Sequence, residues 1–256
     1  MNKLKEELLS GKTMIGVGIT LNDPRVVEQV QLLDYVWIDT EHSPKDYQVV
    51  DMQILAAKAY GLYSLVRVPS HDPFHAKRIL EMKPDGIIFP NVATVDEAKT
   101  VMDACIYPPH GKRGYGPQRA QNFGYTPQKQ YLEEVTDAVC RIIQVEDREC
   151  VANLEKILKV PFIDACFIGL HDLSASIGRL GDPLHKDVVA LCEIALKKCK
   201  DANVPIGVGG ISGFNMQDVQ LLSDKGFRFF FLGCDYDFIT AGTKRFVENI
   251  QIACKK

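Results

Sequence analysis

The chain has 256 residues, of which 46% are hydrophobic and 25% charged, a composition typical of globular proteins and not of disordered or fibrous ones. The formal net charge of −3 indicates no strongly basic surface for nucleic acid or an anionic membrane, and no run approaches the roughly 18 apolar residues of a membrane span. The N-terminus lacks the apolar core of a signal peptide and the eight cysteines form no C-x-x-C pair, so we expect a cytoplasmic protein with reduced thiols.

Short apolar runs alternate with longer amphipathic segments along the chain. The predicted strands are, in order, 14–19, 34–39, 63–68, 86–90, 140–146, 163–169, 204–209 and 227–233. The predicted helices are 24–33, 44–60, 72–82, 94–105, 128–138, 149–159, 184–202, 214–224 and 236–255. Three of these helices are expected to start at Pro24, Pro44 and Pro73, each of which follows a residue type that caps helices. The strand runs are almost continuously apolar, which is typical of parallel strands covered on both faces.

Eight strands alternating with helices predict a (β/α)8 (TIM) barrel, formed as a single domain over residues 1–256. The helix at 236–255 is additional to that pattern, and its amphipathic character suits oligomerisation. A doubly wound dinucleotide-binding fold is disfavoured, because the first strand runs into GVGIT and not into G-x-G-x-x-G. The segment 106–127 is irregular, and a loop of that length in a compact domain more often has a function than not. Because it follows a predicted helix, the topology places it at the N-terminal end of the barrel.

Polar side chains gather at the C-terminal ends of four predicted strands, where a barrel of this kind places its catalytic groups. They are Asp39, Glu41, His42, Arg67, Gln144, Glu146 and Asp172. Each has an ordinary explanation by itself: Asp172 can cap a helix, Glu146 can form a surface ion pair, and His42 can be a hydrogen-bonded loop residue. An arginine inside a barrel strand is harder to explain, because its burial is costly unless an anion meets it. Together the residues predict an active site.

Glu146 and Asp172 form the predicted metal pair. Two neighbouring carboxylates repel each other unless a cation lies between them, and ligation by oxygen alone suits Mg²⁺ or Mn²⁺. Such a metal would keep positions open for water and for substrate oxygens. The two acids therefore predict a divalent-cation site at the mouth of the barrel.

Arg67 and His42 supply the other elements of the chemistry. The guanidinium offers a fork for a substrate carboxylate or carbonyl oxygen, and the imidazole titrates near neutral pH and can carry a proton. Asp39 or Glu41 would orient the histidine ring. A metal, an arginine and a base together can form and stabilise the enolate of a 2-oxo acid.

Five motifs, in this order, resemble the HpcH/HpaI aldolases: IDTEHSP, RVP, YPPHGKRGYGPQRA, IQVED followed by VANLEKIL, and IGLHDLSASIG. The resemblance extends from about residue 11 to the last helix. It implies a metal-dependent (class II) pyruvate aldolase of the 4-hydroxy-2-oxo-heptanedioate or 2-keto-3-deoxy sugar acid type, a carbon–carbon lyase that uses Mg²⁺, Mn²⁺ or Co²⁺. Such an enzyme cleaves a 4-hydroxy-2-oxo acid to pyruvate and an aldehyde.

The resemblance also implies roles for individual residues. It assigns catalytic roles to His42, Arg67, Asp39 and Glu81, metal ligation to Glu146 and Asp172, and substrate contacts to Arg67, Gln144, Gly169, Leu170 and His171. His42 is the base, Arg67 binds pyruvate, and backbone N–H groups after Gly169 hold the pyruvate carboxylate. Glu81 matches an acid that the family contributes to a neighbouring subunit's site. The implied assembly is a homohexamer with swapped C-terminal helices.

The sequence departs from the family pattern at Leu170, where many relatives have proline, at His171, and at Asp147. Leu170 and His171 would line the carboxylate pocket, so these departures leave the identity of the substrate and the direction of the reaction open, and an oxaloacetate-type decarboxylase acting through the same enolate is an alternative. The sequence does not specify the aldehyde or the stereochemistry at C4. A Schiff-base aldolase is disfavoured because no lysine falls in a predicted strand. A phosphate-binding isomerase finds partial support in GVGGISG at 207–213, and a non-catalytic barrel would not need the clustered polar residues.

Overall fold

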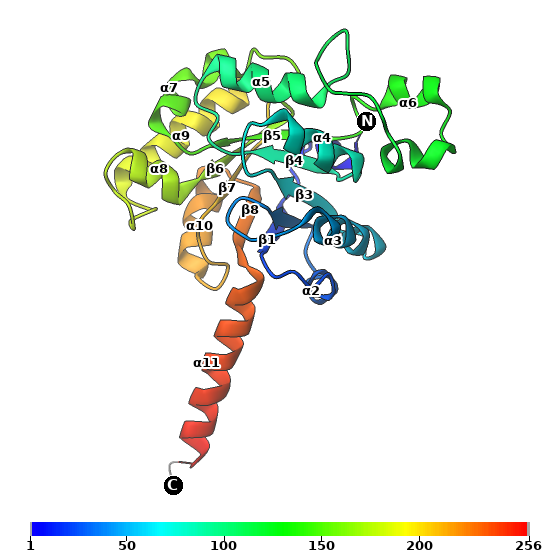
Figure 1. Ribbon diagram of the computed structural model, residues 1–256. Coiled ribbons are helices and arrows are strands. Elements are labelled where there is room, and N and C mark those ends of the chain that lie inside the picture. Colours follow the sequence, from blue (N-terminus) through cyan, green and yellow to red (C-terminus); the bar gives the residue numbers. More distant parts are fainter. Residues whose placement is uncertain (1, 255–256) are drawn as a thin grey trace.

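The computed structural model describes residues 2–254; Lys255, the last residue of the predicted final helix, lies outside them. Eight parallel strands close into a barrel in chain order, with β8 paired to β1 (Figure 1). The strands are β1 (Met14–Ile19), β2 (Tyr35–Asp39), β3 (Tyr63–Arg67), β4 (Gly86–Phe89), β5 (Cys140–Val145), β6 (Ala165–Gly169), β7 (Ile206–Gly209) and β8 (Phe229–Cys234). The predicted (β/α)8 barrel is confirmed, and every strand lies within two residues of its predicted bounds.

Helices surround the barrel and follow the strands in the predicted order. They are α1 (Lys3–Leu9), α2 (Arg25–Gln29), α3 (Tyr47–Ala59), α4 (Pro73–Glu81), α5 (Val95–Cys105), α6 (Gln128–Glu134), α7 (Arg148–Ile157), α8 (Leu170–Ser176), α9 (Lys186–Asp201), α10 (Met216–Lys225) and α11 (Asp235–Cys254), with a 3₁₀-helix, η1 (Arg119–Gly124). The predicted start of α3 at Pro44 was wrong, because Asp46 caps this helix by accepting a hydrogen bond from the Val49 N–H. The sequence analysis also missed α8, which begins directly at the end of β6.

Large aromatic side chains opposite glycines fill the barrel interior. The Trp37 and Phe167 rings meet edge to face with centroids 5.0 Å apart, and Phe231 packs on the other side of Trp37 at the same distance. A Cβ atom at Gly207 would stand 2.4 Å from the Phe167 ring, so that position has space only for hydrogen. The interior is therefore a packed core over most of its height, as in other barrels of this type.

Helix α1 closes the N-terminal end of the barrel. Leu4 and Leu8 on this helix are buried against the interior aromatic cluster. Lys5, on the same helix, forms an ion pair with Asp164, whose carboxylate also pairs with Arg141 at 2.8 Å. These buried charges meet each other, so the burial does not leave an unpaired ion.

Helix α11 extends away from the barrel (Figure 1). It exposes a series of large apolar side chains, including Phe246 at 65% and Ile252 at 73% of their full accessible surface. Isolated exposed apolar residues are common, but a row of them on one protruding helix indicates a surface that packs against protein. Its role in oligomerisation stays a prediction.

The segment 106–127 packs against the outer helices through arginine. Arg113 is buried and donates from Nη2 to Glu81 Oε1 at 2.8 Å, at the end of α4. The Arg113 guanidinium also lies 4.6 Å from the centre of the Tyr107 ring. Further along, Arg119 pairs with Asp51 on α3. The segment thus has fixed structure, anchored to α3 and α4.

Two expectations from composition can be compared with the fold. All eight cysteines are free, and six of them are buried. Within residues 2–254, no helix is both long and apolar enough to span a membrane.

Candidate active site

Arg67 is the centre of a polar network at the C-terminal end of the barrel. The register of β2 and β3 places Asp39 beside Arg67, and Arg67 Nε donates to Asp39 Oδ1 at 2.9 Å. Arg67 Nη1 lies 2.9 Å from Glu41 Oε2. The arginine that the sequence predicted to need an anion therefore has two carboxylate partners, both from β2 and the loop after it.

The Arg67–Asp39 pair stays charged in spite of its burial. Burial alone would raise the pKa of Asp39, but the hydrogen bond and the charge of Arg67 outweigh it and hold that pKa below its ordinary value. Burial alone would lower the pKa of Arg67, yet the contact with Asp39 raises it. A fixed ion pair of this kind orients the guanidinium while both groups remain ionised at neutral pH.

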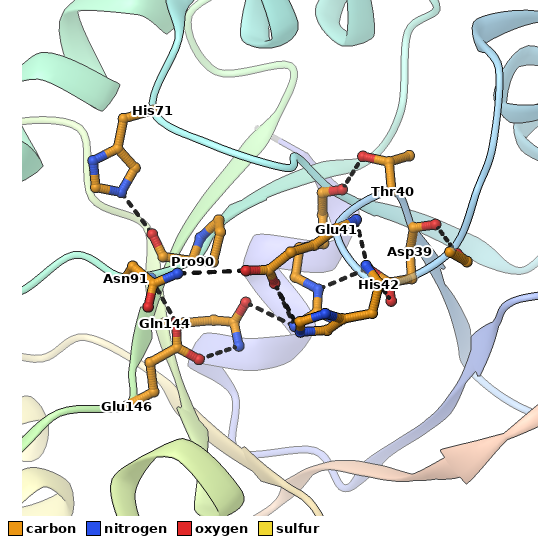
Figure 2. A network of polar contacts seen from close by, with 11 residues as sticks. Asp39, Thr40, Glu41, His42, His71, Pro90, Asn91, Gln144 and Glu146 are labelled. Atoms are coloured by element: carbon orange, nitrogen blue, oxygen red, sulfur yellow. Dashed lines mark hydrogen bonds and ion pairs between the residues drawn. The ribbon is translucent and has the colours of Figure 1, made fainter. Parts of the chain in front are cut away.

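Gln144 and Glu146 continue the network along β5 (Figure 2). Gln144 Oε1 accepts from Arg67 Nη1 at 3.5 Å, and Gln144 Nε2 donates to Glu146 Oε2 at 3.0 Å. Side chains two positions apart along a strand point to the same face, which brings these two residues together. Asp39, Arg67, Gln144 and Glu146 are thus linked in a continuous chain across the end of the barrel.

Asn91, which the sequence analysis missed, joins this network from the end of β4. Its backbone N–H donates to Glu146 Oε1 at 2.5 Å, and its side chain donates from Nδ2 to Glu41 Oε1 at 3.4 Å (Figure 2). Its φ of 56° lies in the left-handed region, which asparagine tolerates better than most residues. An asparagine directly after the strand-ending Pro90 was the available signal.

Glu146 is the most strongly perturbed acid of the site. Burial, together with the nearby charges of Asp172 and Glu41, raises its pKa to about 7 against the opposing hydrogen bond from Asn91. Gly169 stands next to it, where a Cβ atom would lie 2.9 Å from Glu146 Oε2. A residue larger than glycine at position 169 would therefore crowd the Glu146 carboxylate.

This set of donors fits a hard divalent cation. The donors that the sequence predicted are the pair Glu146 and Asp172, and within residues 2–254 no group of three or more His, Cys, Asp and Glu side chains is arranged to hold a metal. Two carboxylates with water and substrate oxygens in the other positions is a usual environment for Mg²⁺. The mutual repulsion that raises the pKa of Glu146 is the condition that a cation would relieve.

His42 stands at the open edge of the site. Its side chain is 68% exposed, and its Nε2 lies 3.6 Å from Glu41 Oε2. Asp39 does not contact the ring: it accepts from Arg67 and from the backbone N–H groups of Glu41 and His42. Of the two acids that could orient the ring, Glu41 is therefore the one in position. Burial is the main cause that raises the pKa of Glu41.

A cavity of about 320 Å³ opens beside this network. Trp37, Phe167 and Phe231 line it together with the polar residues Arg67, Gln144 and Asp172, and His42 and His171 are also among its lining residues. Gly169 and Leu170 line it where α8 begins, and Gly169 offers no side chain to cap that helix. A cavity with an aromatic floor and a few convergent polar groups is typical of a small-molecule site.

Glu81 lies apart from the residues that line this cavity. It ends α4, and its Oε1 pairs with Arg113. The helices of the barrel run back toward the N-terminal ends of the strands, so this acid lies away from the site of its own chain. The predicted contribution of Glu81 to a neighbouring subunit is not tested by a single chain.

The sequence and the fold resemble known proteins along most of the chain. The model of the family described as HpcH/HpaI aldolase/citrate lyase matches residues 15–240. A 4-hydroxy-2-oxovalerate aldolase of Rhodococcus jostii is 38% identical over 211 residues, which cover 81% of each chain. A 4-hydroxy-2-oxo-heptane-1,7-dioate aldolase of Salmonella dublin is 34% identical over 209 residues, 81% of this chain and 80% of the relative.

Solved structures agree with the sequence relatives. An HpcH/HpaI aldolase/citrate lyase family protein from Burkholderia cenocepacia superposes with a TM-score of 0.89 at 28% identity, covering 98% of this chain and 100% of the other. An HpcH/HpaI aldolase from Desulfitobacterium hafniense gives the same TM-score at 25% identity, with 97% and 96% covered.

Proposed function

The chain belongs to the HpcH/HpaI aldolase/citrate lyase family, and from that premise we propose that it is a divalent-metal-dependent lyase that cleaves a 4-hydroxy-2-oxo acid reversibly to pyruvate and an aldehyde. The observation that carries the proposal is the continuous polar chain from Asp39 through Arg67 and Gln144 to Glu146, beside Asp172 and an open cavity.

Glu146 and Asp172 would hold the cation, with Mg²⁺, Mn²⁺ and Co²⁺ as the candidates. When bound, it would supply positive charge that stabilises the enolate oxygen and the substrate carbonyl. The carboxylate repulsion, the raised pKa of Glu146 and the space left by Gly169 support this assignment.

Arg67 would bind the pyruvate part of the substrate. Asp39 and Glu41 hold its Nε and Nη1 atoms and fix the plane of the guanidinium, while the side chain still lines the cavity. A donor fixed in advance loses no orientation entropy when the negative charge develops on the substrate oxygen. Gln144 would fix the positions of the Arg67 and Glu146 side chains relative to each other, because it hydrogen-bonds to both.

The start of α8 would hold the substrate carboxylate. Gly169 and Leu170 line the cavity there, and a helix start presents backbone N–H groups that interact favourably with an anion. This arrangement would place the 2-oxo acid end of the substrate deep in the cavity. The aldehyde end would then lie toward His42.

His42 would transfer the proton. In the cleavage direction its ring accepts the proton of the C4 hydroxyl, the C3–C4 bond breaks, and the electron pair of that bond forms the enolate of pyruvate. Protonation of the enolate carbon at C3 then gives pyruvate. The proton taken from the C4 hydroxyl balances the one added at C3, and the exposed position of the ring beside Glu41 lets it move this proton directly or through water.

The assembly is proposed as a homohexamer with swapped C-terminal helices, in which Glu81 reaches a neighbour's site. The exposed apolar side chains of α11 support this part of the proposal.

Removal of the metal tests the function directly. The chelated protein should lose both cleavage of 4-hydroxy-2-oxo acids and the exchange of pyruvate methyl protons with solvent deuterium, and Mg²⁺, Mn²⁺ or Co²⁺ should restore both. A Schiff-base enzyme would instead keep its activity in the chelator, and borohydride would trap a lysine adduct with pyruvate. Chelator-resistant activity with such an adduct would overturn the metal assignment.

A further inference from the structure

A second cavity, of about 410 Å³, lies at the N-terminal end of the barrel, opposite the active site. Four parts of the chain form it: the end of α1 with the turn after it, Leu196 and Lys200 on α9, residues 203–206 that lead from α9 into β7, and residues 225–229 from the end of α10 to the start of β8. Nothing in the proposed aldolase chemistry uses this end of the barrel.

Positive charge is concentrated in this cavity. The basic residues that line it are Lys12, Lys200, Lys225 and Arg228, and no aspartate or glutamate is among its lining residues. The chain as a whole carries more acidic than basic residues, with a formal net charge of −3. A hollow lined by charges of one sign focuses its field and attracts anions.

Two of the four cations are free to meet a ligand. Lys12 pairs with Glu7 at 2.9 Å and Lys225 with Glu193 at 2.6 Å. In the described part of the chain, no such ion pair involves Lys200 or Arg228. These two residues thus supply net positive charge to the cavity.

Arg228 is held in a fixed orientation. Its Nη1 donates to the Ser223 carbonyl at 2.8 Å and to the Phe227 carbonyl at 2.6 Å. All its side-chain hydrogen bonds within residues 2–254 are made by this one nitrogen. The edge formed by Nε and Nη2, which binds a phosphate or carboxylate with two parallel bonds, therefore remains available.

The rest of the lining is apolar. Leu9, Leu196 and Val204 line the cavity and keep part of their surface accessible, Leu9 at 49%. A small inorganic ion would leave this apolar surface exposed to water, whereas a ring or short acyl chain attached to the anionic group would cover it. Burial of apolar surface contributes about 25 cal/mol per Å².

We propose that this cavity binds a small organic anion, in which an apolar body lies on Leu9, Leu196 and Val204 and a phosphate or carboxylate group is bound by Arg228 and Lys200. The site is separate from the proposed aldolase site, so its occupancy does not depend on that function.

Calorimetric titration of the metal-loaded, pyruvate-saturated protein with phenyl phosphate tests the proposal, since pyruvate occupies the active site. We expect saturable binding at one site. Inorganic phosphate should bind at least about 10-fold more weakly, because it lacks the ring. Phenol should also bind at least about 10-fold more weakly, because it lacks the anionic group.

The variant Lys200→Gln/Arg228→Gln should bind phenyl phosphate at least about 10-fold more weakly than the parent. Arg228→Lys keeps the charge, removes the fork and should also weaken binding. Lys156→Gln/Lys159→Gln is the control, because it removes the same charge from a different cavity and should leave the affinity unchanged. Three results would overturn the proposal: no saturable binding by the parent, unchanged affinity in the first variant, or equal loss in the control.

Discussion

Replacement of Glu146 by glutamine should remove most of the pH dependence that this buried acid gives to the stability of the metal-free protein. Glu146 has a pKa near 7 in the folded chain, against an ordinary value of 4.5, mainly because it is buried. A raised pKa means that the folded state prefers the protonated acid. The stability linked to this preference is fully present below pH 4.5 and is lost as the pH rises through 7.

The size of the effect follows from the two pKa values. Each pKa unit corresponds to about 1.4 kcal/mol, so the loss between pH 5 and pH 8 comes to about 2 to 3 kcal/mol. For a chain of this length, the melting temperature of the parent should therefore fall by about 5 to 10 °C relative to that of Glu146→Gln, which has no ionisable group at this position. The Glu146→Gln protein keeps a neutral oxygen to accept from the Asn91 N–H.

The assay is thermal unfolding in a chelator at half-unit steps from pH 5 to pH 8. The melting temperature of the parent should fall relative to that of Glu146→Gln as the pH rises, while Glu134→Gln, at an exposed position on α6, should follow the parent. A lost hydrogen bond would shift the melting temperature of Glu146→Gln by the same amount at every pH, so it cannot produce a difference that grows with pH. Parallel curves for the parent and Glu146→Gln would refute the reasoning. Saturating Mn²⁺ should abolish the loss in the parent, because a bound cation favours the ionised carboxylate.

The other predictions concern catalysis. His42→Ala should lower turnover by about 10²- to 10⁴-fold with metal affinity retained, because a positioned base contributes that much, and near-parental cleavage rates would contradict the role. Arg67→Lys should weaken pyruvate binding, measured by isothermal titration, since lysine cannot reproduce the fork; unchanged affinity would show that another group binds pyruvate. Gly169→Ala should lower metal affinity by about 10- to 100-fold, because the new Cβ would stand 2.9 Å from Glu146 Oε2, and a normal dissociation constant would show that the carboxylate can move freely. Mixed oligomers of Glu81→Ala and His42→Ala subunits should recover some activity, and none in demonstrably mixed oligomers would argue against a shared site.

The apolar patterning of the sequence determined the barrel. Eight almost continuously apolar runs of five to seven residues, separated by amphipathic segments, leave few other ways to bury the strands on both faces. The same pattern indicated where the strands end, and therefore which polar residues lie at one face of the barrel. Helix starts were less certain: α8 was missed because it follows β6 without a loop, and no capping side chain marks its start.

Only the tertiary structure decided which of the polar residues touch. The sequence left Asp39 and Glu41 as equal partners for His42, whereas the register of β2 on β3 engages Asp39 with Arg67 and leaves Glu41 beside the ring. The contact of Asn91 with Glu146 likewise joins residues of neighbouring strands, 55 positions apart in the chain.

The cavity at the N-terminal end could not be predicted from the sequence either. Lys12, Lys200 and Arg228 are ordinary surface residues in their local segments, and nothing in those segments relates them to one another. They meet because the barrel closes, so that β8 returns to pair with β1 and brings the first helix beside the last strands. Local patterning specifies which face of each element is apolar, but the distance between two side chains is set by the closure of the whole sheet.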